Sequence, residues 1–275
     1  MLLNLYHLLL LSLSILNYLF DNEESHLRIY IADENESVSK RPGMLVCPGG
    51  GYSFCSEREG ENVACRFLSE GFNCFVLYYT VNKKYPAPQL DLALVFAYIR
   101  QHEEEFKLLP NTLSIIGFSA GGHLVGSYGY LYPELAELLK VEPTLLRPFS
   151  ITMAYPVVVL TSKTHSGTRD VISENEPELI EKLNIPEHVT SDYPPTFVWT
   201  TKDDDLVPSI NSVLMAEALE KNHVPYEFHL YESGWHGASI ANRSCTNKGD
   251  LTEKMKDFRD WASLTSDFIF RLLDK

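Results

Sequence analysis

The chain has 275 residues, of which 45% are hydrophobic and 22% charged, and its formal net charge is −14. This composition is that of an ordinary globular protein with one large domain or two small ones. A surface so acidic repels phosphate backbones, so we expect no nucleic-acid partner. The five cysteines form no C-x-x-C pair, which argues against a zinc site and against a disulfide framework.

Residues 1–26 form an N-terminal apolar segment of uncertain role. Residues 1–20 are rich in leucine and contain no lysine or arginine, but they lack the basic start and the small-residue cleavage site of a signal peptide. Asn4, His7 and Asn17 interrupt the apolar run, which weakens a membrane span. We expect the segment to pack on the domain of a cytoplasmic protein without a stable membrane partner. Export or anchoring through residues 1–20 is the alternative.

Strand and helix patterns alternate along the rest of the chain. Strands are expected over residues 27–31, 44–47, 74–80, 112–118, 151–155, 196–201 and 226–231, and helices over residues 59–70, 89–106, 209–221 and 250–273. The central strands are nearly continuous apolar runs, which is typical of a parallel sheet covered on both faces. The pattern predicts an α/β fold with a mostly parallel central sheet and helices on both faces, formed by a single domain over residues 27–275.

Residues 156–195 are the least regular stretch of this expected domain. They are polar, with a helix-like pattern near 177–183. A long excursion at this point of the fold is a candidate lid or substrate-binding insertion, and a surface excursion without a role in function is the alternative. We expect the pocket walls to come from this stretch and from residues 52–58.

The segment Gly117-Phe118-Ser119-Ala120-Gly121 contains the pattern G-x-S-x-G between an apolar strand and a segment compatible with a helix. This layout is that of a nucleophile elbow, a tight turn from strand to helix. Small residues must flank the serine in such a turn, and Gly117 and Gly121 meet that need. We expect the hydroxyl of Ser119 at the apex, at the positive end of the helix dipole.

A serine hydroxyl needs a base within hydrogen-bond reach, and the base needs an acid that orients it. After the expected strand 196–201 come Asp203, Asp204 and Asp205. Functional groups of open α/β sheets lie at such carboxyl ends of strands. We favour Asp204, because its spacing to Val207-Pro208 resembles the acid loop of α/β-hydrolases. A solvated acidic turn accounts for the other two aspartates.

The base is expected at His236. Of the nine histidines, it is the one that follows a late strand in a glycine-rich loop downstream of the acid. Flanking glycines allow the loop to carry an imidazole over the edge of the sheet. His123, on the expected elbow helix, is interpreted as a packing or helix-bonded residue, and His188, His223 and His229 receive the same interpretation.

A run of three glycines, Gly49-Gly50-Gly51, follows the expected strand 44–47. Consecutive glycines let backbone N–H groups point into a cavity with no side chain in the way. We therefore expect Gly50 and Gly51, together with Ala120 after the serine, to hold the oxyanion of a tetrahedral intermediate. A phosphate-binding loop is the rival interpretation, but neither G-x-G-x-x-G nor a P-loop pattern is present. A plain glycine turn is a further alternative.

Together these motifs resemble the α/β-hydrolase superfamily, and within it the small esterase/lipase group of acetyl-xylan esterase-like or "sugar hydrolase" proteins. The resemblance covers about residues 27–273, although the lipase-type motif H-G-G-G begins with histidine where this chain has Pro48. It implies that Ser119 is the nucleophile, His236 the base and Asp204 the partner of the base. It also implies that Gly50, Gly51 and Ala120 donate to the oxyanion.

The activity expected on these grounds is that of a serine carboxylesterase that hydrolyses small acyl esters through an acyl-enzyme, with acetyl esters of carbohydrates as candidates. Such chemistry requires no metal and no organic cofactor, and its partner is a small-molecule ester. A homo-oligomer is left open. An amidase or small peptidase, for instance arylformamidase-like, would use the same triad. The third hypothesis is a non-catalytic binding protein on a hydrolase scaffold, which typically loses a triad residue, and here none is lost.

Overall fold

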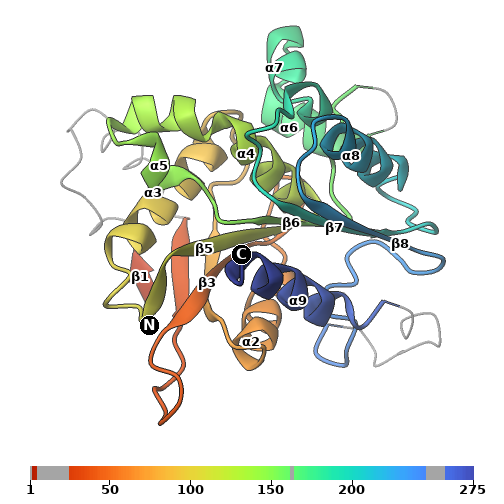
Figure 1. Ribbon diagram of the computed structural model, residues 1–275. Helices are drawn as coiled ribbons and strands as arrows, with labels where there is room; N and C mark the ends of the chain where they lie inside the picture. The colour runs from red at the N-terminus through yellow and green to blue at the C-terminus, as the bar shows by residue number, and fades with distance from the viewer. Residues whose placement is uncertain (1, 5–24, 162–163, 246–257) are drawn as a thin grey trace.

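The computed structural model describes residues 2–4, 25–161, 164–245 and 258–275, and its centre is an eight-stranded sheet in the order β1-β2-β4-β3-β5-β6-β7-β8 (Figure 1). The strands are β1 (Leu2–Asn4), β2 (His26–Tyr30), β3 (Arg41–Cys47), β4 (Asn73–Tyr78), β5 (Leu108–Phe118), β6 (Ile151–Ala154), β7 (Thr196–Thr201) and β8 (Tyr226–Tyr231). From β4 to β8 all neighbours pair in parallel, whereas β1 and β2 add an antiparallel edge. The predicted α/β class is confirmed.

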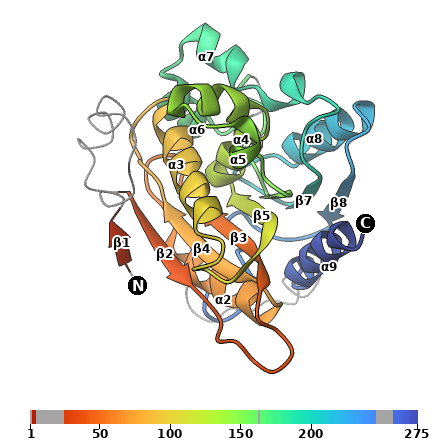
Figure 2. The same cartoon turned by 60° about the vertical axis from the view of Figure 1, so that its left-hand side comes forward.

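Helices cover both faces of the sheet (Figure 2). On one face lie α2 (Glu61–Ser69) and α9 (Trp261–Leu273), and on the other lie α3 (Ala87–Gln101), α4 (Ala120–Leu139), α5 (Pro143–Leu146) and α8 (Ile210–Lys221). Each face of the sheet has its own apolar core. Every residue of the inner strand β4 is buried between these two layers. Burial on both sides explains why the inner strands are continuous apolar runs without alternation.

The helix expected over 89–106 is shorter than predicted, since α3 ends at Gln101. Residues 102–107 turn back so that Leu108 can begin β5 beside β3. Phe106 lies in this turn and is buried against the ring of Phe75, with centroids 5.2 Å apart. An apolar residue that packs from a turn therefore imitated the spacing of a longer helix.

The expected closing helix over 250–273 was also too long. Residues 258–260 form a turn, and α9 begins at Trp261. Trp261 is fully buried and stacks on Trp199 of β7, with centroids 5.1 Å apart. The part of the prediction over 250–257 lies outside the described residues.

The stretch 156–195 is more regular than its sequence suggested. It contains α6 (Ser166–Ser173), the expected helix near 177–183 as α7 (Pro177–Lys182), and a short 3-10 helix η3 (Ile185–His188). Its apolar residues Ile172, Leu183 and Ile185 are buried in the domain core. These elements are too short for a clear periodic pattern, and their stability comes from packing on the domain.

The described part of the N-terminal segment is β1, which pairs antiparallel with β2. Residue 1 and residues 5–24 lie outside the described part of the chain, so packing, export and anchoring of this segment stay predictions. Among the described residues, the structure contains no helix with the length and apolar character needed to cross a bilayer.

Candidate active site

Ser119 lies at the turn between β5 and α4, with φ 53° and ψ −116°. This backbone conformation is rare for a residue with a side chain, and it persists because the surroundings fix it. A Cβ on Gly117 would lie 2.0 Å from the carbonyl oxygen of Gly121, and a Cβ on Gly121 would lie 2.2 Å from that of Cys47. The elbow therefore needs glycine at both flanking positions.

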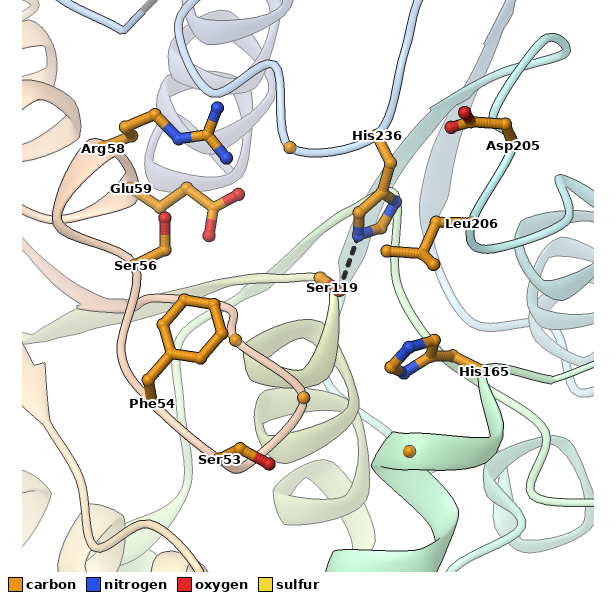
Figure 3. A pocket seen from close by; sticks show the side chains of 14 residues that line it. Ser53, Phe54, Ser56, Arg58, Glu59, Ser119, His165, Asp205, Leu206 and His236 are labelled. Carbon is orange, nitrogen blue, oxygen red and sulfur yellow. Dashed lines mark hydrogen bonds between the residues drawn. The ribbon is translucent and has the colours of Figure 1, made fainter. Parts of the chain in front are cut away.

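The side chains of Ser119, His236 and Asp204 form one hydrogen-bonded line. Oγ of Ser119 lies 2.8 Å from Nε2 of His236 (Figure 3), and Nδ1 of His236 lies 2.8 Å from Oδ2 of Asp204. Because an ionised carboxylate accepts and does not donate, Nδ1 carries the proton and Nε2 is left to accept from the serine. The three residues follow β5, β8 and β7, so the parallel strands bring them to one edge of the sheet.

The backbone holds the carboxylate of Asp204 in place. Its Oδ1 accepts the N–H groups of Leu206 at 3.0 Å and Val207 at 2.8 Å, and its side chain has no exposed surface. Asp203 and Asp205 are exposed, so they occupy the solvated part of the turn. The structure thus places the aspartate chosen from the sequence against the histidine.

The glycine run curves beside the serine. Gly50 and Gly51 have φ values of 131° and 65°, a region that favours glycine. Both line the pocket that opens at Ser119. The N–H of Gly49 is engaged, because it donates to Oε2 of Glu59 at 2.8 Å. Ala120 opens α4, where a backbone N–H has no carbonyl partner within its own helix. Gly50, Gly51 and Ala120 therefore stay the candidate donors to an oxyanion.

A pocket of about 510 Å³ opens at Ser119 and His236. Both regions predicted as walls contribute to it, the loop 52–58 and the stretch 156–195, and the loop after β7 adds a third wall (Figure 3). Besides the serine and histidine, the side chains that line it belong to Ser53, Phe54, Ser56, Arg58, Glu59, His165, Asp205 and Leu206. Six of these eight residues are polar, while the exposed surface of the pocket is more apolar than polar, so the pocket presents both apolar surface and hydrogen-bonding groups to a ligand.

His165 was not singled out from the sequence. It caps α6, because its Nδ1 accepts the N–H of Thr168 at 3.1 Å. This bond leaves Nε2 as the protonated nitrogen of the neutral ring. Partial burial and the nearby His236 lower the pKa of His165, which favours that neutral form. The sequence offered no signal for it, because α6 was not predicted and a single histidine in an irregular stretch indicates no site.

His123 has the structural role that the sequence suggested. Its Nε2 donates to the carbonyl of Leu183 at 3.0 Å, so its Nδ1 accepts from the hydroxyl of Tyr52 at 2.9 Å. Burial lowers the pKa of His123 to about 4, which keeps the ring neutral. The residue connects the elbow helix to the loop after β3 and to the stretch 156–195.

Known proteins are similar to this chain in sequence and in fold. A family model described as BD-FAE matches residues 27–142. The structure of a sugar hydrolase from Lactococcus lactis is 33% identical, with a TM-score of 0.78, over 92% of this chain and 96% of that one. The chain belongs to the α/β-hydrolase superfamily, in its esterase group. The resemblance inferred from the motifs is confirmed.

Two further relatives of this α/β-hydrolase have names that refer to xylan or xylosides. The acetyl ester-xyloside bifunctional hydrolase from Caldicellulosiruptor lactoaceticus is 33% identical, with a TM-score of 0.77, over 90% of this chain and 88% of that one. Endo-1,4-beta-xylanase B from Butyrivibrio fibrisolvens is 33% identical over 222 residues, which is 76% of this chain and 34% of that protein. The chain spans between 34% and 46% of the length of the curated relatives that it matches.

Proposed function

We propose that this α/β-hydrolase is a serine carboxylesterase that hydrolyses small acyl esters, with acetyl esters of carbohydrates as its substrate class. The observation that carries the proposal is the hydrogen-bonded line from Ser119 through His236 to the buried Asp204, which ends at an open pocket. Two of the related structures are a sugar hydrolase and an acetyl ester-xyloside bifunctional hydrolase, which supports the choice of acyl group and alcohol.

The geometry supports a two-step reaction through an acyl-enzyme. Oγ of Ser119 attacks the ester carbonyl carbon while Nε2 of His236 takes its proton. The carbonyl oxygen becomes an oxyanion beside the N–H groups of Gly50, Gly51 and Ala120. The carboxylate of Asp204 stabilises the imidazolium, which then gives the proton to the oxygen of the departing alcohol. Water attacks the acyl-enzyme by the same route and releases the acid.

The size of the pocket and the polar groups in it are compatible with a sugar as the alcohol. Hydroxyl, guanidinium, imidazole and carboxylate groups surround the serine, and a volume of about 510 Å³ is ample for a monosaccharide ester. Phe54 is 60% exposed, which leaves an aromatic side chain available to lie against a sugar ring.

The test is a comparison of purified protein on p-nitrophenyl acetate, on esters with longer acyl chains, and on acetylated xylo-oligosaccharides. We expect the highest kcat/KM on acetyl esters. Ser119→Ala should lower kcat by at least about 10⁴-fold without changing the Tm. Turnover retained by that variant would refute the mechanism. Turnover of aryl formamides in the absence of esterase activity would select the amidase alternative.

A further inference from the structure

Glu59 is a buried carboxylate that lines the pocket but lies outside the hydrogen-bonded line of Ser119, His236 and Asp204. It ends the short 3-10 helix η2 (Glu57–Glu59) and is 2% exposed. A carboxylate removed from water is unfavourable unless donors compensate it. The structure supplies two donors from two separate segments of the chain, which is the first sign that the residue has a role in the site.

The two oxygens of Glu59 join different loops. Oε2 accepts the N–H of Gly49 at 2.8 Å, directly before the expected oxyanion donors. Oε1 accepts the hydroxyl of Tyr155 at 2.7 Å, one residue after the end of β6. One side chain thus fixes the glycine run relative to the carboxyl end of a central strand.

Tyr155 extends this connection to the loop after β8 that carries His236, residues 232–241, which we call the histidine loop. Its hydroxyl accepts the N–H of Ser239 at 3.0 Å, and its ring lies edge-on to that of His236, with centroids 5.1 Å apart. Burial, with Glu59 beside it, raises the pKa of Tyr155 well above its ordinary value, so the phenol stays protonated and donates to the carboxylate. The residue also has a φ of 35°, a conformation that persists only where the surroundings impose it.

The histidine loop contacts η2 at two further points. Oγ of Ser239 donates to the carbonyl of Arg58 at 2.7 Å. Gly237 has a φ of 76°, and a Cβ there would lie 3.1 Å from Nη2 of Arg58. The loop that carries the base is therefore packed directly on the short helix that carries Glu59.

We infer that Glu59 is a positioning residue which, with Tyr155, sets the spacing between the oxyanion donors and His236. The inference rests on the proposed esterase function. The reaction needs the N–H groups of Gly50 and Gly51 on the carbonyl oxygen at the moment when Nε2 of His236 takes the serine proton. A shift on the order of 1 Å between these groups lowers the rate by up to about 100-fold.

The test uses Glu59→Gln and Tyr155→Phe in the full chain. An amide presents one oxygen and one NH₂ group, so it cannot accept from both the N–H of Gly49 and the hydroxyl of Tyr155. We expect either variant to lower kcat on p-nitrophenyl acetate by about 10- to 100-fold, with KM changed by less than about threefold. Both variants break the bond between Tyr155 and Glu59, and Tyr155→Phe also removes the acceptor of the N–H of Ser239, so the double variant should lose little more than Tyr155→Phe alone.

The chain offers a matched control on the same 3-10 helix. The hydroxyl of Tyr78 donates to Oε2 of Glu57 at 2.9 Å, and neither residue lines the pocket. Glu57→Gln and Tyr78→Phe remove a second Tyr–Glu pair, so they report any general effect of loosening η2. Both should keep the kcat of the unmodified protein.

The outcomes separate this inference from the proposed function. A kcat within twofold of the unmodified protein for Glu59→Gln or, where that variant does not fold, for Tyr155→Phe would overturn the positioning role, while inactivity of Ser119→Ala still supports the esterase. A raised KM with unchanged kcat, or an equal loss in the Glu57→Gln control, would also overturn it. No turnover above Ser119→Ala in the unmodified protein would refute the proposed function itself.

Discussion

The substitution Asp204→Asn isolates the orienting acid, because it removes the charge while it keeps the shape of the side chain. In the structure, Oδ1 of Asp204 accepts the N–H groups of Leu206 and Val207, and Oδ2 faces Nδ1 of His236 at 2.8 Å. The single oxygen of an asparagine must stay with the two backbone donors. Its NH₂ group is then turned toward the histidine.

The expected loss follows from the proton on the imidazole. Two donors cannot face each other, so the ring of His236 must move its proton to Nε2, which then donates to Ser119 and no longer accepts from it. A serine hydrolase with the wrong tautomer loses about 10⁴-fold in kcat. This ratio corresponds to about 5 kcal/mol of transition-state stabilisation. Stability should change little, because the two backbone hydrogen bonds survive.

The assay is steady-state hydrolysis of p-nitrophenyl acetate, with urea denaturation of the same preparations. Asp203→Asn is the matched control, since Asp203 lies in the same turn but is exposed. It should keep kcat within about twofold, as surface substitutions usually do. A loss below about tenfold for Asp204→Asn, or a larger loss for Asp203→Asn, would show that the acid has been misassigned.

Three further changes test other parts of the structure. His165→Ala removes the cap that the N–H of Thr168 receives from Nδ1, so it should lower the free energy of unfolding by about 1 kcal/mol and also raise KM. His165→Asn should restore the free energy of unfolding but not KM. Urea denaturation and steady-state kinetics of both variants check this. Gly121→Ala places a Cβ 2.2 Å from the carbonyl oxygen of Cys47, so we expect a loss of about 3 kcal/mol in urea denaturation and no measurable turnover, and normal activity would contradict the elbow geometry. Burial raises the pKa of Asp91 from 3.8 to about 6. The unfolded chain therefore loses this proton at lower pH than the folded one, and the stability of the natural protein relative to Asp91→Asn should fall by about 3 kcal/mol as the pH rises from about 4 to above 6. A rise over that interval, measured by urea denaturation at several pH values, would refute the sign.

The order of the motifs made the fold and the candidate residues accessible from the sequence. A G-x-S-x-G between a strand and a helix specifies a turn that only small flanking residues permit, and the contacts of Gly117 and Gly121 show the steric reason. Parallel strands end at one edge of the sheet, so the loops after them meet in space whatever their separation along the chain. This is how Ser119 and His236 could be chosen together although 117 positions separate them.

The boundaries of helices were harder to predict, because packing from turns imitates helical spacing. Phe106 packs on Phe75 from the turn after α3. Its position continues the apolar spacing of that helix, although the helix ends at Gln101. Short helices of the stretch 156–195 have the opposite problem, since they are stabilised by the domain and have too few residues for a pattern.

By itself the sequence determined the parallel sheet, the elbow and the order of serine, acid and base, because each of these depends on local residue types and on strand ends. The tertiary structure alone decided what surrounds them. The bond from Tyr155 to Glu59 and the bond from Ser239 to Tyr155 join segments that are distant in the chain, and the position of His165 at the pocket depends on how the stretch 156–195 packs on the domain. No local sequence pattern specifies such contacts. Whether a glutamate is buried or solvated depends on tertiary packing, which residue type alone does not show.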